Sequence, residues 1–172
     1  MRPQTIIPVE EYLKTVYRPD RDYVDGVVED RNVGENDHSY LQKKLLLFLA
    51  GLEQELGIYV VQEQRVQIAA TRFRIPDTCI MLGGRPAEPI FTTPPLICIE
   101  VLSPEDRYSR LQERIGDYLK FGVREVWVLD PKAKRAWVHD PQGSREVLEG
   151  ALHFQAQGNA PEIVVPLLAL FE

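Results

Sequence analysis

A short segment near the middle of the chain, LICIEVLSP at residues 96–104, constrains the fold more than any other. Apolar side chains fill both sets of alternating positions in this segment, which is typical of a strand buried on both faces. Glu100 interrupts the apolar run. Because burying an ionised carboxylate without partners is costly, the surrounding fold must supply Glu100 with a compensating charge or ligand.

A second acid lies in a similar setting, in RFRIPDTCIMLG at residues 72–83. Strand alternation places Asp77 on one face with Phe73 and Cys79. Two neighbouring strands that each bury an acid are best explained by a shared divalent cation with hard oxygen ligands, Mg²⁺ or Mn²⁺. Either acid taken alone could instead pair with a buried arginine or lie at a hydrated strand end.

The other apolar patterns predict the elements around these two strands. They indicate a short helix at 8–17, a strand or hairpin at 22–31, a helix from Asn36 or Asp37 to Gly57, β-rich stretches at 58–70 and 72–83, a helix ending at Gly122, and two strands joined across Pro131. The order is helix, strand, helix, three strands, helix, and two or more strands. We therefore predict an α/β protein with a mixed β-sheet flanked by helices, formed by residues 1–172 as one domain.

Length and composition exclude several classes of protein. A chain of 172 residues that is 44% hydrophobic can bury a sizeable core. No apolar run approaches the ~20 residues that span a bilayer, and no long apolar stretch follows the N-terminal basic residue, so we expect neither export nor membrane insertion. The two cysteines, Cys79 and Cys98, lie in apolar runs, which favours core positions and a reduced, cytoplasmic setting.

The net charge of -6 argues against a protein that coats nucleic acid without specificity, because such binding needs clustered Lys and Arg. Local basic strips are not excluded by the net charge. Each of them can equally be the solvated face of an amphipathic helix. The candidates are Lys43 with Lys44, and the series Arg107, Arg110, Arg114 and Lys120.

Two further residues could face the same site as the acids. His38 projects onto the side of Leu45 at the start of the long helix, and therefore inward. An inward histidine can equally be a hydrogen-bonded core residue. Glu63 shares strand parity with Val61 and Arg65, and either approaches the site or lies on an ordinary sheet face.

Taken in order, these residues resemble the Uma-type family of predicted endonucleases, in the PD-(D/E)XK restriction-endonuclease-like superfamily. The resemblance runs from about Tyr23 to Pro131. It rests on the ordered series DG, His, Glu, PD, EVLSP and GVREVWVLDP, since a PD dipeptide alone carries no information.

The resemblance implies a restriction-endonuclease-like fold and a metal-dependent DNA hydrolase. Asp77, Glu100 and the backbone carbonyl of Val101 would hold a catalytic Mg²⁺ ion, for which Mn²⁺ could substitute. His38 and Glu63 would line the site. Water activated on the metal would then hydrolyse phosphodiester bonds of DNA, without a nucleophilic side chain.

One position departs from the superfamily motif, because the third residue of the E-x-K triplet is Leu102 and not lysine. The family that the chain resembles commonly supplies this cation from the following helix, where the matching residue is Arg114. Arginine can stabilise charge there, but it cannot act as a base. Arg114 can equally pair with Glu113 or Asp117 at the surface. Glu29 matches a position where the family tends to carry an acid near the site.

Two classes of function follow from this resemblance and its departure. The first is a Mg²⁺-dependent endonuclease whose partner is DNA of unknown sequence. Nucleases of this type that cut both strands generally do so as dimers, which makes a homodimer one expected state. The second is a catalytically weak or inactive nuclease-fold module that acts in nucleic-acid or protein binding, favoured by the acidic net charge and by the exchange of lysine for arginine.

Overall fold

The computed structural model describes residues 5–31, 35–155 and 162–172. Its elements, in chain order, are α1 (Val9–Lys14), β1 (Asp22–Val24), β2 (Val27–Glu29), α2 (Asn36–Ala50), α3 (Glu53–Leu56), β3 (Ile58–Gln62), β4 (Val66–Ala69), β5 (Arg72–Arg74), β6 (Thr78–Leu82), β7 (Ile97–Val101), α4 (Tyr108–Phe121), β8 (Glu125–Asp130), β9 (Arg135–Asp140), β10 (Gly143–Val147), β11 (Ala151–Gln155), β12 (Glu162–Pro166) and α5 (Leu167–Phe171). The strands form sheets in the orders β2-β1-β5-β4, β10-β9-β8-β7-β6-β3 and β11-β12. The α/β class is therefore confirmed.

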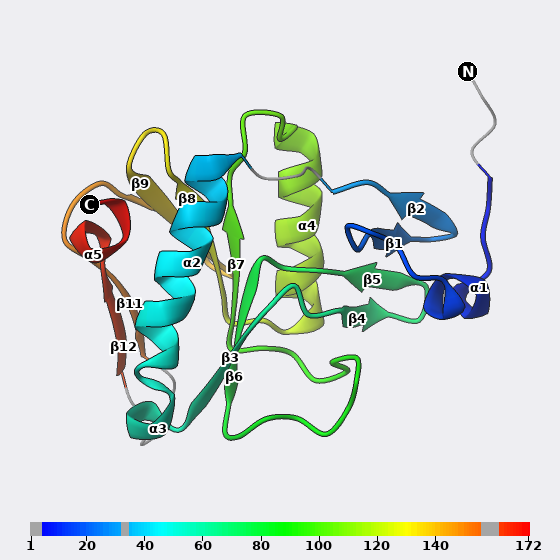
Figure 1. The fold of residues 1–172 in the computed structure, drawn as a ribbon, viewed down its shortest axis with the longest axis horizontal. Coiled ribbons are helices and arrows are strands. Elements are labelled where there is room, and N and C mark those ends of the chain that lie inside the picture. The colour runs from blue at the N-terminus through cyan, green and yellow to red at the C-terminus, as the bar shows by residue number, and fades with distance from the viewer. Residues whose placement is uncertain (1–4, 32–34, 156–161) are drawn as a thin grey trace.

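The six-stranded sheet is mixed, as predicted, because β7 and β8 run parallel while their other neighbours pair antiparallel. Strand β7 lies inside this sheet and all of its residues are buried. Leucines of α2 pack against Ile97 and Ile99 on one face of the sheet. Ile115 and Tyr118 of α4 pack near Cys98 on the other face. Figure 1 shows β7 between these two helices. Glu100 lies on the α4 face, because its carboxylate accepts a hydrogen bond from Tyr118 of α4.

The predicted long helix is two helices. Helix α2 follows Glu35 as its N-cap, which is one residue before Asn36, the first of the two predicted caps. It ends at Ala50, and α3 ends at the predicted stop, Gly57, which is left-handed with φ of 59°. The break is stabilised by Glu53, whose carboxylate accepts a hydrogen bond from the backbone N–H of Val60 at 2.6 Å and so ties α3 to β3.

The segment 72–83 contributes to two sheets, so the expectation of one continuous face was wrong. Phe73 of β5 packs against Tyr12 and Tyr23 in the four-stranded sheet, whereas Cys79 of β6 packs under α4. Pro76 explains the break, because proline cannot donate a ladder hydrogen bond and is disfavoured inside a sheet. Asp77 is buried as expected, but it lies just before β6 and not within the strand.

The predictions about the two cysteines and about membrane-spanning segments can be compared with the described residues. Cys79 and Cys98 are both buried and unpaired, as their apolar surroundings predict. No helix in the described ranges is long and apolar enough to cross a membrane.

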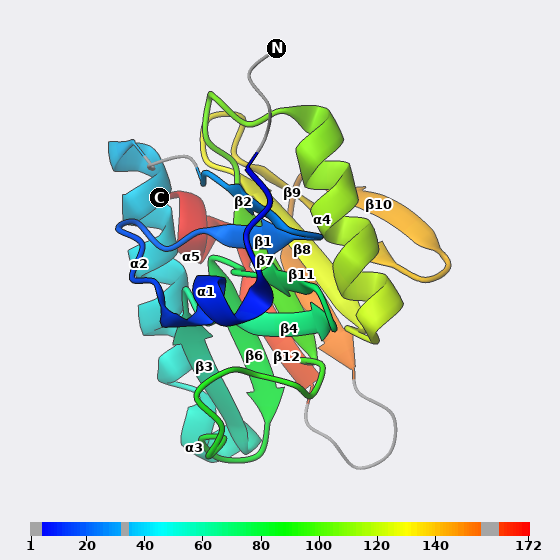
Figure 2. The ribbon, with the colours of Figure 1, turned by 90° about the vertical axis from the view of Figure 1, so that its right-hand side faces the viewer.

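Arg74 of β5 connects the four-stranded sheet to α4. Its side chain is only 1% exposed, yet it pairs with carboxylates from two directions. Asp22 and Glu29 of the β1–β2 hairpin accept from Nη1 at 3.1 and 3.0 Å, and Asp117 of α4 accepts from Nε at 2.8 Å. Figure 2 shows the hairpin beside α4, where these residues meet. The network fixes the hairpin against the helix that faces Glu100.

We expect Arg74→Met to destabilise the fold by about 3–5 kcal/mol, because the change leaves several carboxylates without their buried partner. Arg72→Met is the matched control, since Arg72 lies on the same strand and contacts Asp117 but is 30% exposed. It should cost about 1 kcal/mol or less. Unfolding in urea measures both values, and equal losses would contradict a special role for Arg74.

Candidate active site

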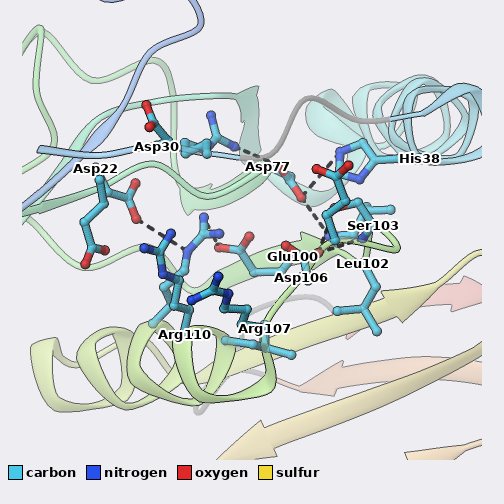
Figure 3. Close-up of a pocket in the computed structure, with 16 residues that line it drawn as sticks. Asp22, Asp30, His38, Asp77, Glu100, Leu102, Ser103, Asp106, Arg107 and Arg110 are labelled. Carbon is cyan, nitrogen blue, oxygen red and sulfur yellow. Dashed lines mark hydrogen bonds and ion pairs between the residues drawn. The ribbon is translucent and has the colours of Figure 1, made fainter. Parts of the chain in front are cut away.

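A pocket of about 320 Å³ opens where the β1–β2 hairpin, α2, β7 and α4 meet (Figure 3). Its walls come from segments that are far apart in the sequence. The lining residues are Asp22, Glu29, Asp30, Arg31, His38, Asp77, Glu100, Val101, Leu102, Ser103, Glu105, Asp106, Arg107, Arg110, Leu111 and Arg114.

Glu100 lies at the buried edge of this pocket, near the end of β7. Its Oε1 accepts a hydrogen bond from the Tyr118 hydroxyl at 2.7 Å and pairs with Arg114 Nη2 at 2.9 Å. Burial raises the pKa of Glu100 to about 8, and the nearby charge of Asp77 acts in the same direction, while Arg114 and Tyr118 oppose the rise. The fold thus compensates this carboxylate only in part.

Asp77 reaches the same pocket from the segment before β6. The antiparallel register pairs Thr78 with Ile99, which brings Asp77 to the end of β7. The backbone N–H of Val101 donates to its Oδ2 at 2.7 Å, and Arg31 Nη2 donates to its Oδ1 at 2.8 Å. The two acids singled out by the sequence therefore line one pocket, although strand ends and not continuous strands bring them there.

His38 faces this pocket from the first turn of α2, in the direction that its helical projection predicts. Its Nε2 lies 3.8 Å from Asp77 Oδ2. Its Nδ1 is buried and has no hydrogen-bond partner among the described residues. His38 is therefore next to a metal-ligand candidate, and its participation in chemistry stays a prediction.

Arg114 points from α4 toward Glu100 and not toward the surface. Besides Glu100, its Nη2 donates to the carbonyl of Ile75 at 3.0 Å, and its Nε lies 3.6 Å from Asp22 Oδ2. Although burial acts against the charged form, Glu100 and other acids keep the pKa of Arg114 well above its ordinary value. Arg114 is thus a permanent cation in the pocket. The alternative surface partner, Asp117, pairs with Arg72 and Arg74 instead.

Glu63 does not line the pocket, which corrects the expectation that it faces the site. The parity argument assumed that the strand continues through this residue, but β3 ends at Gln62. Glu63 adopts a left-handed conformation with φ of 50°, and its side chain is exposed. Only its backbone N–H approaches the site, by donating to the carbonyl of Asp77 at 3.3 Å.

The β1–β2 hairpin supplies residues that the sequence did not single out. Asp22, Asp30 and Arg31 line the pocket together with Glu29, the acid that the resemblance placed near the site. Asp22 carried a usable signal, because it is an acid that begins an apolar strand, as Glu100 interrupts one. Arg31 carried none, since its position depends on how the whole hairpin packs against the sheet.

The pocket fits a divalent cation of the Mg²⁺ type. Within the described ranges no three His, Cys, Asp or Glu side chains converge as a complete metal cage. Mg²⁺ does not require one, because it commonly uses one or two carboxylates, waters and substrate phosphate. Asp77, Glu100 and Val101 all line the pocket. Beside them, the Nε atoms of Arg31 and Arg114 are buried without hydrogen-bond partners in the described structure.

Comparison with known proteins identifies similar chains. A family model described as "Uma2: Putative restriction endonuclease" matches residues 9–168. The crystal structure of "a putative nuclease belonging to DUF820 from Anabaena variabilis ATCC 29413" is similar in fold, with a TM-score of 0.82 at 22% sequence identity, over 96% of this chain and 97% of that chain. No curated protein matches this sequence.

We expect Tyr118→Phe to lower the free energy of unfolding by about 1–3 kcal/mol, because Glu100 then loses a buried donor. Tyr59→Phe is the control, since Tyr59 packs in the same cluster and its hydroxyl has no hydrogen bond within the described ranges. It should cost less than Tyr118→Phe. Chemical denaturation of both variants measures the difference, and equal stabilities would show that the hydroxyl contributes nothing to Glu100.

Proposed function

The chain belongs to the Uma2 family, and on that premise we propose that it is a divalent-metal-dependent endonuclease that hydrolyses phosphodiester bonds of DNA. The observation that carries the proposal is the set of opposite charges in one pocket. Asp77 and Glu100 offer oxygen ligands, while Arg31 and Arg114 present guanidinium groups beside them. Phosphodiester hydrolysis needs both kinds of group, because a metal ligand set and stabilisation of developing negative charge must act on the same phosphate.

Each residue then has a distinct role. Asp77, Glu100 and the carbonyl of Val101 would hold Mg²⁺ or Mn²⁺, and the metal would supply an activated water and withdraw charge from the phosphate. Arg114 stabilises the charge that develops on the phosphate, since it stays protonated and cannot serve as a base. Tyr118 orients Glu100 through its hydroxyl.

A specific observation also favours the second candidate, a weak or inactive nuclease-fold module that binds nucleic acid or protein. Both acids already have arginine partners, Arg31 for Asp77 and Arg114 for Glu100. An arginine that permanently occupies a carboxylate oxygen competes with a metal for it. The two candidates therefore differ in whether a metal can enter and whether bound DNA is then cut.

We expect Asp77→Asn and Glu100→Gln each to abolish DNA cleavage and to weaken Mn²⁺ binding, because each removes an anionic ligand. Cleavage of supercoiled and linear DNA with Mg²⁺, Mn²⁺ or EDTA, together with titration calorimetry of Mn²⁺, measures both effects. Glu63→Gln is the matched control, an exposed acid outside the pocket that should change neither. Mn²⁺ binding that needs both acids, without cleavage of any DNA or RNA by the wild-type protein, would select the second candidate.

We expect Arg114→Ala to lose about 10² or more in cleavage rate, the scale of removing one preorganised charge-stabilising group. Arg114→Lys should keep or improve cleavage, because lysine carries the charge and can also orient water. Mn²⁺ affinity should survive both changes, since the ligands are intact. Circular dichroism and melting temperature establish that each variant is folded. An Arg114→Ala protein that cuts at the wild-type rate would refute the role.

The proposed endonuclease also acts as a homodimer when it cuts both strands, since each metal-bound pocket would serve one strand at a time. Sedimentation velocity of the protein with and without DNA tests this state.

A further inference from the structure

We propose that Arg107 and Arg110 form a phosphate-binding wall that holds the DNA backbone beside the reacting phosphate. The inference rests on the proposed function and adds a binding subsite to it. The wall contacts phosphates that do not react, so it acts in binding and register and not in the chemical step.

The positions of these arginines on α4 define a line that leads out of the pocket. Arg107 is the N-cap of the helix, Arg110 lies in its first turn and Arg114 lies one turn further. All three line the pocket. The helical rise of about 1.5 Å per residue separates Arg107 from Arg114 by about 10 Å along the axis. Figure 3 shows Arg107 and Arg110 extending from α4 on the same side of the pocket as Glu100.

The two outer arginines, Arg107 and Arg110, differ from the inner one, Arg114, in their partners. Arg114 is held by Glu100 and is mostly buried. Arg107 and Arg110 are exposed, and neither forms an ion pair with a described residue. Asp106, the acid next to Arg107, has its carboxylate turned back to Ser103, whose backbone N–H donates to it at 2.6 Å. Two guanidinium groups therefore remain available at the rim.

A linear polyanion fits this arrangement better than an isolated anion does. The inner cation, Arg114, contacts Glu100, a proposed metal ligand, and the outer two continue in one direction along the helix. In a chain with net charge of -6, such a local strip is what allows a phosphate backbone to approach. Contacts of this kind fix register without reading bases, because phosphates carry no sequence information directly.

The test compares Arg107→Gln, Arg110→Gln and the double variant with Lys120→Gln. Lys120 is the matched control, an exposed cation on the last turn of α4 that does not line the pocket. Fluorescence anisotropy with a labelled DNA duplex of mixed sequence, in Ca²⁺ instead of Mg²⁺, gives the affinity over a series of KCl concentrations. Each wall variant should reduce the slope of log affinity against log salt by about 1, and the double variant by about 2. Lys120→Gln should keep the wild-type slope.

Cleavage kinetics in Mg²⁺ separate the wall from the catalytic groups. The wall variants should raise KM and change kcat little, because they remove binding that is equal in the ground and transition states. Wild-type salt slopes in the double variant, or a fall in kcat with unchanged KM, would overturn the inference while leaving the proposed nuclease intact. The inference is also overturned if the wild-type protein cuts DNA but Lys120→Gln and the wall variants have the same salt slope. If the wild-type protein neither binds nor cuts DNA, the proposed function itself fails, and the inference fails with it.

Discussion

The burial of Glu100 in the middle of the six-stranded sheet is the constraint on which the site depends. The residue lies 3% exposed between apolar neighbours, and a charge in that position must be compensated locally. Helix α4 supplies most of the compensation through Tyr118 and Arg114. The packing of α4 on this face of the sheet is therefore not only apolar. It is also specified by one carboxylate that accepts a hydrogen bond and an ion pair from the same helix.

A second buried charge, that of Arg74, positions the β1–β2 hairpin, which forms another wall of the pocket. Because Asp22, Glu29 and Asp117 all converge on it, the β1–β2 hairpin and α4 are connected through one guanidinium group. Asp22 also lies 3.6 Å from Arg114, so the two networks meet. The hairpin that carries Arg31 and the helix that carries Arg114 are thus positioned by the same set of ion pairs. Local geometry at the site depends on tertiary charge pairing more than on either element alone.

The sequence predicts the central elements well because their signals are local. An apolar run on both faces identifies β7 as an interior strand, and a helical apolar pattern ending at Gly122 identifies α4. Parity on β7 also places Glu100 on the face of Cys98, and the structure shows that α4 packs against this face. The same parity argument fails at Glu63, where the strand has already ended, because alternation holds only while the extended backbone continues. Arg31 could not be predicted, since its contact with Asp77 spans 46 residues and depends on the hairpin's position.

The charge balance of the pocket bears on how the proposed reaction would begin. Arg31 and Arg114 already offset the two carboxylates, so the four groups are close to neutral when all are ionised. A divalent cation that binds Asp77 and Glu100 must share these carboxylates with the two arginines, which is unfavourable while the arginines have no other anion to pair with. If a phosphodiester arrives together with the cation, it brings one compensating negative charge. The arginines can then turn toward the phosphate oxygens. Under the proposed function, the two arginine partners thus couple metal binding to substrate binding, because the phosphodiester gives them another anion when the metal takes the carboxylates.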